Sequence, residues 1–514
     1  MGQTNRTSNK TITKNILLLY VRMFLTMIIG LYTSRIVLQV LGVDDYGTYN
    51  VVGGFVFLLS YIKCGFSTAT QRYLNFALGQ EDNAALRNIF SNSLTIYLIF
   101  AFITIVLSET VGLWYLNHHI VIATERVVAA NWVFQCAMLM MVVEMIGIPY
   151  NTCVIVHEHM SVYATISIMD CILRLAVVFA LIVSPFDNLI FYALLMLLVS
   201  VIVLILYIIY CKKHFSECQF RFVLDKYLLK DMFIFQGWSA LGTLGFSFKD
   251  QVINIILNNM LGPALSAARA IANQVSGAIN QFSTNIVTAV SPQITQRYAV
   301  GELEESRRLV YVSSKFSFFL MAIVVVPLIL NLRYVLQLWL GDVPKYACEF
   351  VVIILVGSLI ASLTAPVTTA LMATGKIRAF QIGVSVIFLI EIPVTYYLLK
   401  LGYEPHIALM PCIMTQFAGV VFRFWILQRQ VPGYSLRYFY IQIVLRSLMV
   451  VAIGYIIGCY LQQFCSQGLI RLITSSLVSV ALLSILIYLL GMSREEKLLV
   501  HKFVKDYINK RRNK

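Results

Sequence analysis

Long apolar segments of the chain contain basic side chains, whose charge is costly there without compensation, and four of these residues are candidates for binding an anion. They are Arg22, Arg35, Lys249 and Arg269. An ionised side chain at the centre of a bilayer costs at least about 2.5 kcal/mol, so each cation needs a partner or a water-filled cavity. The planar fork of an arginine fits the oxygens of a phosphate group. These residue types therefore indicate a binding site for a phosphate-bearing anion. The alternative is that each arginine extends to a membrane interface or pairs with a carboxylate such as Asp250.

The four cations lie at graded depths. Arg35 stands seven residues before Gly42. Arg269 stands seven residues after Gly262, so both arginines lie about 10 Å below the outer ends of their helices. Lys249 lies about 20 Å and Arg22 about 30 Å below the outer ends of their helices. If their segments line one cavity, these cations form a series of sites for an anion that crosses the membrane.

Two neighbouring segments carry continuous polar faces, because their polar residues recur at steps of three and four. The first face contains Gln236, Ser239, Thr243, Ser247, Asp250, Asn254 and Asn258. The second contains Arg269, Asn273, Ser276, Asn280, Thr284, Thr288 and Ser291. We expect a hydrated path along these faces, in which Asn273 and Asn280 help to bind the anion. The alternative is interhelical packing through hydrogen bonds.

Carboxylates are fewer in the apolar segments. Glu144, Asp250 and Glu391 are candidates for coupling to a proton or another cation, with a packing role as the alternative. Asp170 has Arg174 one turn later, which is the favourable order for an ion pair along a helix. We therefore interpret Asp170 and Arg174 as a structural pair.

The elements that position these residues are predicted to be membrane-spanning helices. The chain has 514 residues, of which 59% are hydrophobic and 12% are charged, and a soluble surface needs about a quarter charged residues. The predicted fold is therefore an all-α polytopic membrane protein of about fourteen transmembrane helices. They cover 14–40, 46–78, 85–113, 124–155, 159–184, 187–211, 228–260, 264–293, 309–333, 346–374, 376–400, 404–429, 437–464 and 468–491.

The net charge of +15 reflects membrane topology, because the chain offers no soluble basic module that would bind nucleic acid. Most loop Lys and Arg residues fall on the side of the N-terminus, which predicts cytosolic termini. The ten cysteines are scattered through apolar segments and suit buried packing; the spacing of Cys211, His214 and Cys218 matches no common zinc site. No nucleotide-binding loop or catalytic triad is found, so we expect neither an enzyme nor a cofactor nor a metal.

The chain is predicted to divide into two pseudo-symmetric six-helix bundles. The predicted parts are an N-terminal lobe 1–211, a cytosolic connecting loop 212–227, a C-terminal lobe 228–429, two further helices in 430–492 and a basic amphipathic cytosolic tail 493–514. A short repeat supports the two bundles, because Leu41-Gly42 recurs as Leu261-Gly262 and Gln71-Arg72-Tyr73 recurs as Gln296-Arg297-Tyr298.

Over nearly its whole length the chain resembles the Wzx-like polysaccharide-unit flippases of the multidrug, oligosaccharidyl-lipid and polysaccharide (MOP) exporter superfamily. The motifs that carry the resemblance are Lys14 to Gly47, Gln71-Arg72-Tyr73, Asn259 to Ala272, Gln274 to Asn280 and Pro292-Gln293-Ile294. The resemblance implies two bundles around a central cavity lined by the first, second, seventh and eighth helices, which opens alternately to each side of the membrane. It also implies an oligosaccharide on an undecaprenyl pyrophosphate carrier as substrate.

The resemblance implies a bacterial inner membrane location and, as partners, membrane lipids and a polysaccharide polymerase or glycosyltransferases. One alternative is a multidrug and toxin efflux antiporter coupled to sodium or protons. Such an exporter needs cavity carboxylates, whereas the first helix carries Arg22 and Arg35 and no acid. Another alternative is a non-transporting scaffold for polysaccharide synthesis, which would have no use for polar faces that span the bilayer.

Overall fold

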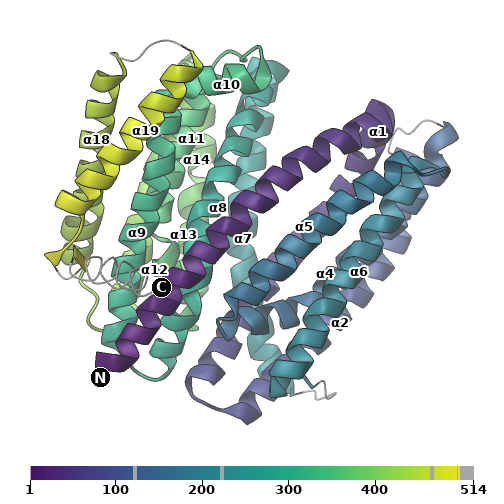
Figure 1. The fold of residues 1–514 in the computed structure, drawn as a ribbon, viewed down its shortest axis with the longest axis horizontal. Helices are drawn as coiled ribbons and strands as arrows, with labels where there is room; N and C mark the ends of the chain where they lie inside the picture. The colour runs from purple at the N-terminus through teal and green to yellow at the C-terminus, as the bar shows by residue number, and fades with distance from the viewer. Residues whose placement is uncertain (1, 120–123, 220–224, 464–467, 495, 498–514) are drawn as a thin grey trace, which may run out of the picture. The chain divides into compact units, whose positions relative to one another are not determined.

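The computed structural model describes residues 2–119, 124–219, 225–463, 468–494 and 496–497 (Figure 1). Every regular element in these ranges is a helix. The prediction of an all-α protein is therefore confirmed. The amphipathic tail predicted for 493–514 lies almost wholly outside the described residues.

The first half of the chain contains the elements α1 Gly2–Gly79, α2 Asn83–Leu107, η1 Ser108–Gly112, α3 Leu113–His119, η2 Thr124–Arg126, α4 Val127–Val156, α5 Met160–Ile182, α6 Asn188–His214 and η3 Ser216–Cys218. α1 consists of two helices that meet at Gly42, whose φ of 78° suits glycine. The Asp82 carboxylate accepts hydrogen bonds from the backbone N–H groups of Ala84 and Ala85, which explains why α2 begins there.

The second half contains α7 Lys226–Leu261, α8 Pro263–Ala299, α9 Leu303–Leu330, α10 Leu332–Leu340, α11 Ala347–Ser362, α12 Ala365–Ala373, α13 Arg378–Leu389, α14 Glu391–Lys400, α15 Pro405–Leu409, α16 Pro411–Gln430, α17 Leu436–Tyr438, η4 Phe439–Leu445, α18 Arg446–Gln462, α19 Leu469–Leu486 and η5 Ile487–Gly491. Several predicted spans are thus interrupted helices. One break lies at Ile390, between α13 and α14, three residues before Pro393, which has no backbone N–H to donate to the carbonyl of Leu389.

Nine helices in the described part of the chain are long and apolar enough to cross a membrane. The pair α11 and α12, bent by 42°, would make a tenth. The remaining predicted spans are the two halves of α1 together with α7 and α8, which are long but carry many polar residues. The chain is therefore a multi-pass membrane protein, and the total of fourteen spans stays a prediction.

The contacts within the chain define two compact units. Unit 1 comprises Met1–Leu244, Thr288–Ser306 and Met372–Ile382. Unit 2 comprises Gly245–Val287, Arg307–Leu371 and Gly383–Lys514. The boundaries fall inside α7, α8, α9, α12 and α13, so continuous helices pass from one unit into the other. The lobes predicted at 1–211 and 228–429 stay a prediction.

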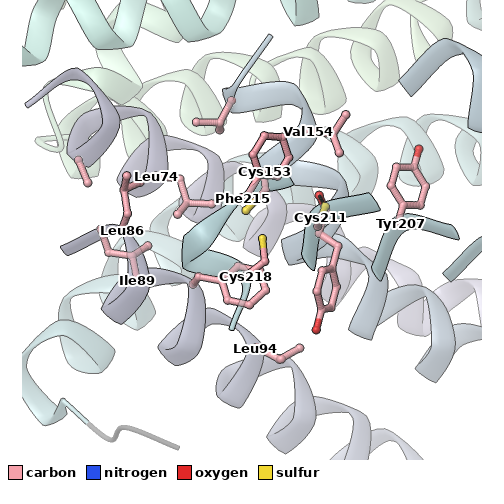
Figure 2. Packing of buried hydrophobic residues seen from close by; sticks show 14 of the residues in the cluster. Leu74, Leu86, Ile89, Leu94, Cys153, Val154, Tyr207, Cys211, Phe215 and Cys218 are labelled. Carbon is pink, nitrogen blue, oxygen red and sulfur yellow. Dashed lines mark hydrogen bonds between the residues drawn. The ribbon is translucent and has the colours of Figure 1, made fainter. Parts of the chain in front are cut away.

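A buried apolar cluster in unit 1 holds three cysteines. Cys153 of α4, Cys211 of α6 and Cys218 of η3 lie together among leucine, isoleucine and aromatic side chains (Figure 2). The Cys211 thiol donates to the backbone carbonyl of Tyr150 at 3.3 Å. His214, in contrast, is exposed. The prediction that cysteines serve as buried packing residues is therefore confirmed for Cys153, Cys211 and Cys218.

The predicted internal repeat has a backbone counterpart in three pairs of left-handed residues. These pairs are Gly42 and Gly262 (φ 78° and 89°), Glu81 and Gly301 (57° and 84°), and Glu158 and Gly375 (58° and 76°). The members of each pair are separated by between 217 and 220 residues and stand at corresponding helix ends. Matching turn geometry at a nearly constant separation supports the duplication.

The two Gln-Arg-Tyr motifs make reciprocal contacts at helix C-termini within unit 1. The Arg72 guanidinium donates through Nε to the carbonyl of Met372 at 3.1 Å and through Nη2 to that of Ala373 at 3.4 Å, at the end of α12. Gln296 donates through Nε2 to the carbonyl of Val156, the last residue of α4, at 3.0 Å. The last carbonyls of a helix lack partners within it. Each repeat therefore supplies a cap to a helix of the other.

This reciprocal capping predicts a stability defect in Arg72→Ala. The change removes donors from two C-terminal carbonyls and should lower the free energy of unfolding by about 1–3 kcal/mol. A thermal unfolding curve of the purified protein in detergent measures the effect, and Arg72→Lys should recover part of it. The control is Arg437→Ala, which removes an exposed arginine. Equal melting temperatures for the Arg72 and Arg437 variants would contradict the assignment.

Candidate functional site

A buried ion pair joins α7 to α14 within unit 2. The Lys249 Nζ lies 3.4 Å from Glu391 Oε2, and the two residues are only 2% and 1% exposed. Thr415 of α16 donates its hydroxyl to the same carboxylate oxygen at 3.0 Å. Phe246 places its ring 4.7 Å from the ammonium nitrogen. The position is therefore closed to water and satisfied by charge, hydroxyl and aromatic contacts.

A second ion pair lies between α7 and α8. Arg269 Nη2 is 2.6 Å from Asp250 Oδ1, and its Nη1 donates to the Asn254 side-chain oxygen and the Asp250 carbonyl, each at 3.1 Å. Asn273 Nδ2 donates to the other carboxylate oxygen of Asp250 at 3.2 Å. The Arg269 side chain is 3% exposed, whereas that of Asp250 is 32% exposed. The carboxylate is therefore the accessible partner.

The two pairs belong to one polar region of unit 2. All four charged groups lie near the Cys412 side chain of α16. Further along α8, Ser276 shares a hydrogen bond of 2.9 Å with Ser358 of α11, and Asn280 donates to Ser276 at 3.2 Å. The polar face predicted on α8 thus contacts polar groups from Arg269 to Asn280. Its proposed hydration stays a prediction.

The structure places the predicted cations as follows. Arg269 pairs with Asp250, which confirms for this residue the alternative of a carboxylate partner, and Lys249 pairs with Glu391. An incoming anion would therefore have to replace an internal one. Arg22 lies in unit 1 with its guanidinium 4.7 Å from the ring of Tyr163 in α5. The side chain of Arg35 lies outside the described residues. Anion binding by these four residues stays a prediction.

Among the predicted acids, Asp170 and Arg174 make the expected contact at 2.9 Å. Glu144 acts electrostatically on Arg174, so it lies in the same part of unit 1. Glu391 showed no partner near it in sequence, and the structure supplies one in Lys249, 142 residues away. Sequence reasoning also missed Thr415, because a single threonine in an apolar helix carries no signal of its own. The described residues contain no group of three potential metal ligands.

Comparison with known proteins gives a family and a fold. Residues 12–298 match the profile of a family described as "Polysaccharide biosynthesis protein", and residues 239–397 match a family named MatE. A search of curated proteins gave no significant match.

Solved structures of MATE transporters share this fold. A MATE transporter in its bent conformation has a TM-score of 0.71 at 14% identity, over 82% of this chain and 96% of that one. An outward-facing multidrug resistance MATE transporter of the MOP superfamily has a TM-score of 0.65 at 14% identity, over 81% and 95%. The MATE transporter ClbM in complex with Rb+ has a TM-score of 0.65 at 16% identity, over 82% and 95%.

The buried pair of Lys249 and Glu391 predicts strong non-additivity. Glu391→Gln or Lys249→Met alone leaves one charge buried without its partner and should destabilise the protein by about 3–5 kcal/mol. The double variant removes both charges and should be far less destabilised than the sum of the two single variants. Thermal unfolding of the four proteins in detergent tests this. Additive effects would show that the two groups do not depend on each other.

Proposed function

The chain belongs to the polysaccharide biosynthesis protein family, and from this premise we propose that it flips an undecaprenyl-pyrophosphate-linked oligosaccharide across the bacterial inner membrane by alternating access. As a member of the MOP superfamily it is a multi-pass membrane transporter. The substrate and the direction are parts of the proposal.

The observation that carries the proposal is the pair of Arg269 and Asp250, in which the carboxylate is the more accessible partner. The buried guanidinium has a carboxylate as its acceptor, and a phosphate offers oxygens of similar geometry and higher charge. An incoming pyrophosphate can therefore replace Asp250 without leaving Arg269 unpaired at any stage. The hydrocarbon tail of the carrier stays in lipid, so only the charged head needs compensation inside the protein.

Displacement of the internal carboxylates offers a route to ion coupling. A carboxylate that loses its cation in a low-dielectric site gains affinity for a proton. Asp250 and, at a deeper step, Glu391 would take up protons or another cation as the phosphate reaches Arg269 and Lys249. Asn273, already bonded to Asp250, and Asn280 on the same helix face would donate amide hydrogens to the moving head.

The efflux alternative has one observation in its favour. The MatE profile covers α7, α8 and the ion pairs, and the accessible group of the Asp250 pair is acidic. A cationic drug would bind Asp250 in place of Arg269. The flippase proposal is better supported, because the polysaccharide biosynthesis profile covers more of the chain and the buried member of the pair is the cation.

The proposal includes a topology with both termini and the loop 212–227 in the cytosol, and partners that comprise membrane lipids and a polysaccharide polymerase or glycosyltransferases. Ser216 of this loop is exposed and suits a labelling test. On a background without native thiols, Ser216→Cys should resist an impermeant maleimide in intact spheroplasts and react after lysis. Labelling in intact spheroplasts would reverse the orientation.

The substrate proposal predicts that Arg269 needs its guanidinium. Arg269→Lys should lower surface display of the glycan several-fold, because an ammonium cannot make the bidentate contact, and Arg269→Ala should abolish display. Arg35→Ala is expected to impair display as well. Display and protein abundance are measured together by glycan antibody and immunoblot, with Arg437→Ala as the control. Normal display in both alanine variants at wild-type abundance would remove anion binding from these residues and favour efflux.

A further inference from the structure

Arg423 of α16 is an arginine inside an apolar helix without an acceptor. Within the described part of the chain, its guanidinium makes no hydrogen bond or ion pair, and its Nε is fully buried. The guanidinium contacts an aromatic face instead, since its carbon lies 5.6 Å from the centre of the Phe388 ring in α13. The helix from Pro405 to Gln430 is long and apolar enough to cross a membrane. A cation in this position is expensive unless an anion joins it.

Four other cations in helices of unit 2 are compensated by the protein. Lys249 has Glu391, Arg269 has Asp250, and Lys315 contacts Glu496. Arg446 donates to two backbone carbonyls at the end of η5. Arg423 differs from all of these, because its neighbourhood supplies an aromatic ring and no oxygen acceptor. The missing acceptor points to a ligand from outside the chain.

The side chain of Arg423 faces away from the exposed side of α16. Met414, Phe417, Val421 and Trp425 are between 37% and 72% exposed and form one face at steps of three and four. Cys412, Gln416, Gly419 and Arg423 follow the same steps on another face, on which Gln416 and Gly419 are buried. Arg423 therefore belongs to the face of α16 that packs inside unit 2.

The guanidinium also points away from the near end of the helix. A Cβ atom placed on Gly419 would lie 3.0 Å from Arg423 Nη1, so the charged group rests beside a residue one turn earlier. A snorkelling arginine would extend instead toward Gln430, where the helix ends. The absence of a side chain at Gly419 makes the space that the guanidinium occupies. The niche is thus formed by Gly419, Phe388 and Arg423 itself.

This niche lies on the same helix as the ion pairs. Thr415, which donates to Glu391, precedes Arg423 by eight residues, or about 12 Å along α16. Cys412, which lies near both ion pairs, is on the same face of α16 as Arg423. The α16 face that carries Cys412 beside the ion pairs therefore continues to Arg423. In the predicted topology Arg423 lies about 10 Å from the cytosolic end, as Arg269 does from the outer end.

We propose that Arg423 is a further binding site for the phosphate head of the substrate, on the cytosolic side of the ion pairs. This inference rests on the proposed function. The ligand is a phosphate or pyrophosphate group, which binds the guanidinium without displacing a carboxylate. Arg423 would therefore be the site that needs no proton uptake, in contrast to Arg269 and Lys249.

The sharpest test supplies Arg423 with an internal anion. Gly419→Asp places a carboxylate one turn before the arginine, where an i, i+4 ion pair forms. Gly419→Asn adds the same volume without charge and is the matched control. We expect Gly419→Asp to lower glycan display at least tenfold at normal protein abundance, and Gly419→Asn to retain most of it. Equal display in both variants at the wild-type level would overturn the site.

If both Gly419 variants lose display, the test moves to Arg423 itself. Glycan display is then measured in Arg423→Gln and Arg423→Lys, with Arg429→Ala as an arginine control near the helix end. Loss in Arg423→Gln with partial recovery in Arg423→Lys supports the site, and normal display in Arg423→Gln overturns it. Inorganic pyrophosphate, titrated into the purified protein in nanodiscs, separates the two proposals. Binding weakened several-fold by Arg269→Gln and unchanged by Arg423→Gln would refute only the Arg423 site. Normal display without the protein would refute the flippase itself.

Discussion

A charge inside the bilayer has to be compensated at the place where it lies, and the polar architecture of this protein follows from that constraint. Lys249 is fixed by Glu391 and Thr415, and Arg269 by Asp250 and its neighbouring amides. Each contact ties one helix to another across unit 2. The charged groups that we propose for binding the anion thus also hold α7, α8, α14 and α16 together.

The constraint also explains which helices look unlike membrane spans. α7 and α8 carry the residues that form the ion pairs and the serine and asparagine contacts, and this polarity lowers their hydropathy. The apolar helices α5 and α6 have exposed apolar side chains, for example Phe179 and Ile209, that suit a lipid environment. The polar helices therefore hold the charged groups, whereas the apolar helices present side chains that suit contact with the hydrocarbon.

Much of this organisation could be predicted from periodicity along the chain. Helix positions, the polar faces of α7 and α8 and the Asp170 to Arg174 contact all follow from residues a few positions apart. The partner of Glu391 could not be predicted, because 142 residues separate it from Lys249 and no local pattern records their contact. Arg423 lies inside the predicted span 404–429 but was not singled out, because the sequence does not show that its guanidinium lacks an acceptor.

The cap that Arg72 provides for α12 has a consequence for the order in which the chain becomes complete. Arg72 and its acceptor Met372 are 300 residues apart. At a synthesis rate of about 5–20 residues per second, roughly 15–60 s pass between the emergence of the donor and that of the acceptor. During this interval the guanidinium must rely on water, lipid headgroups or an insertion chaperone. The first repeat is therefore an unfinished folding unit until the second has been made.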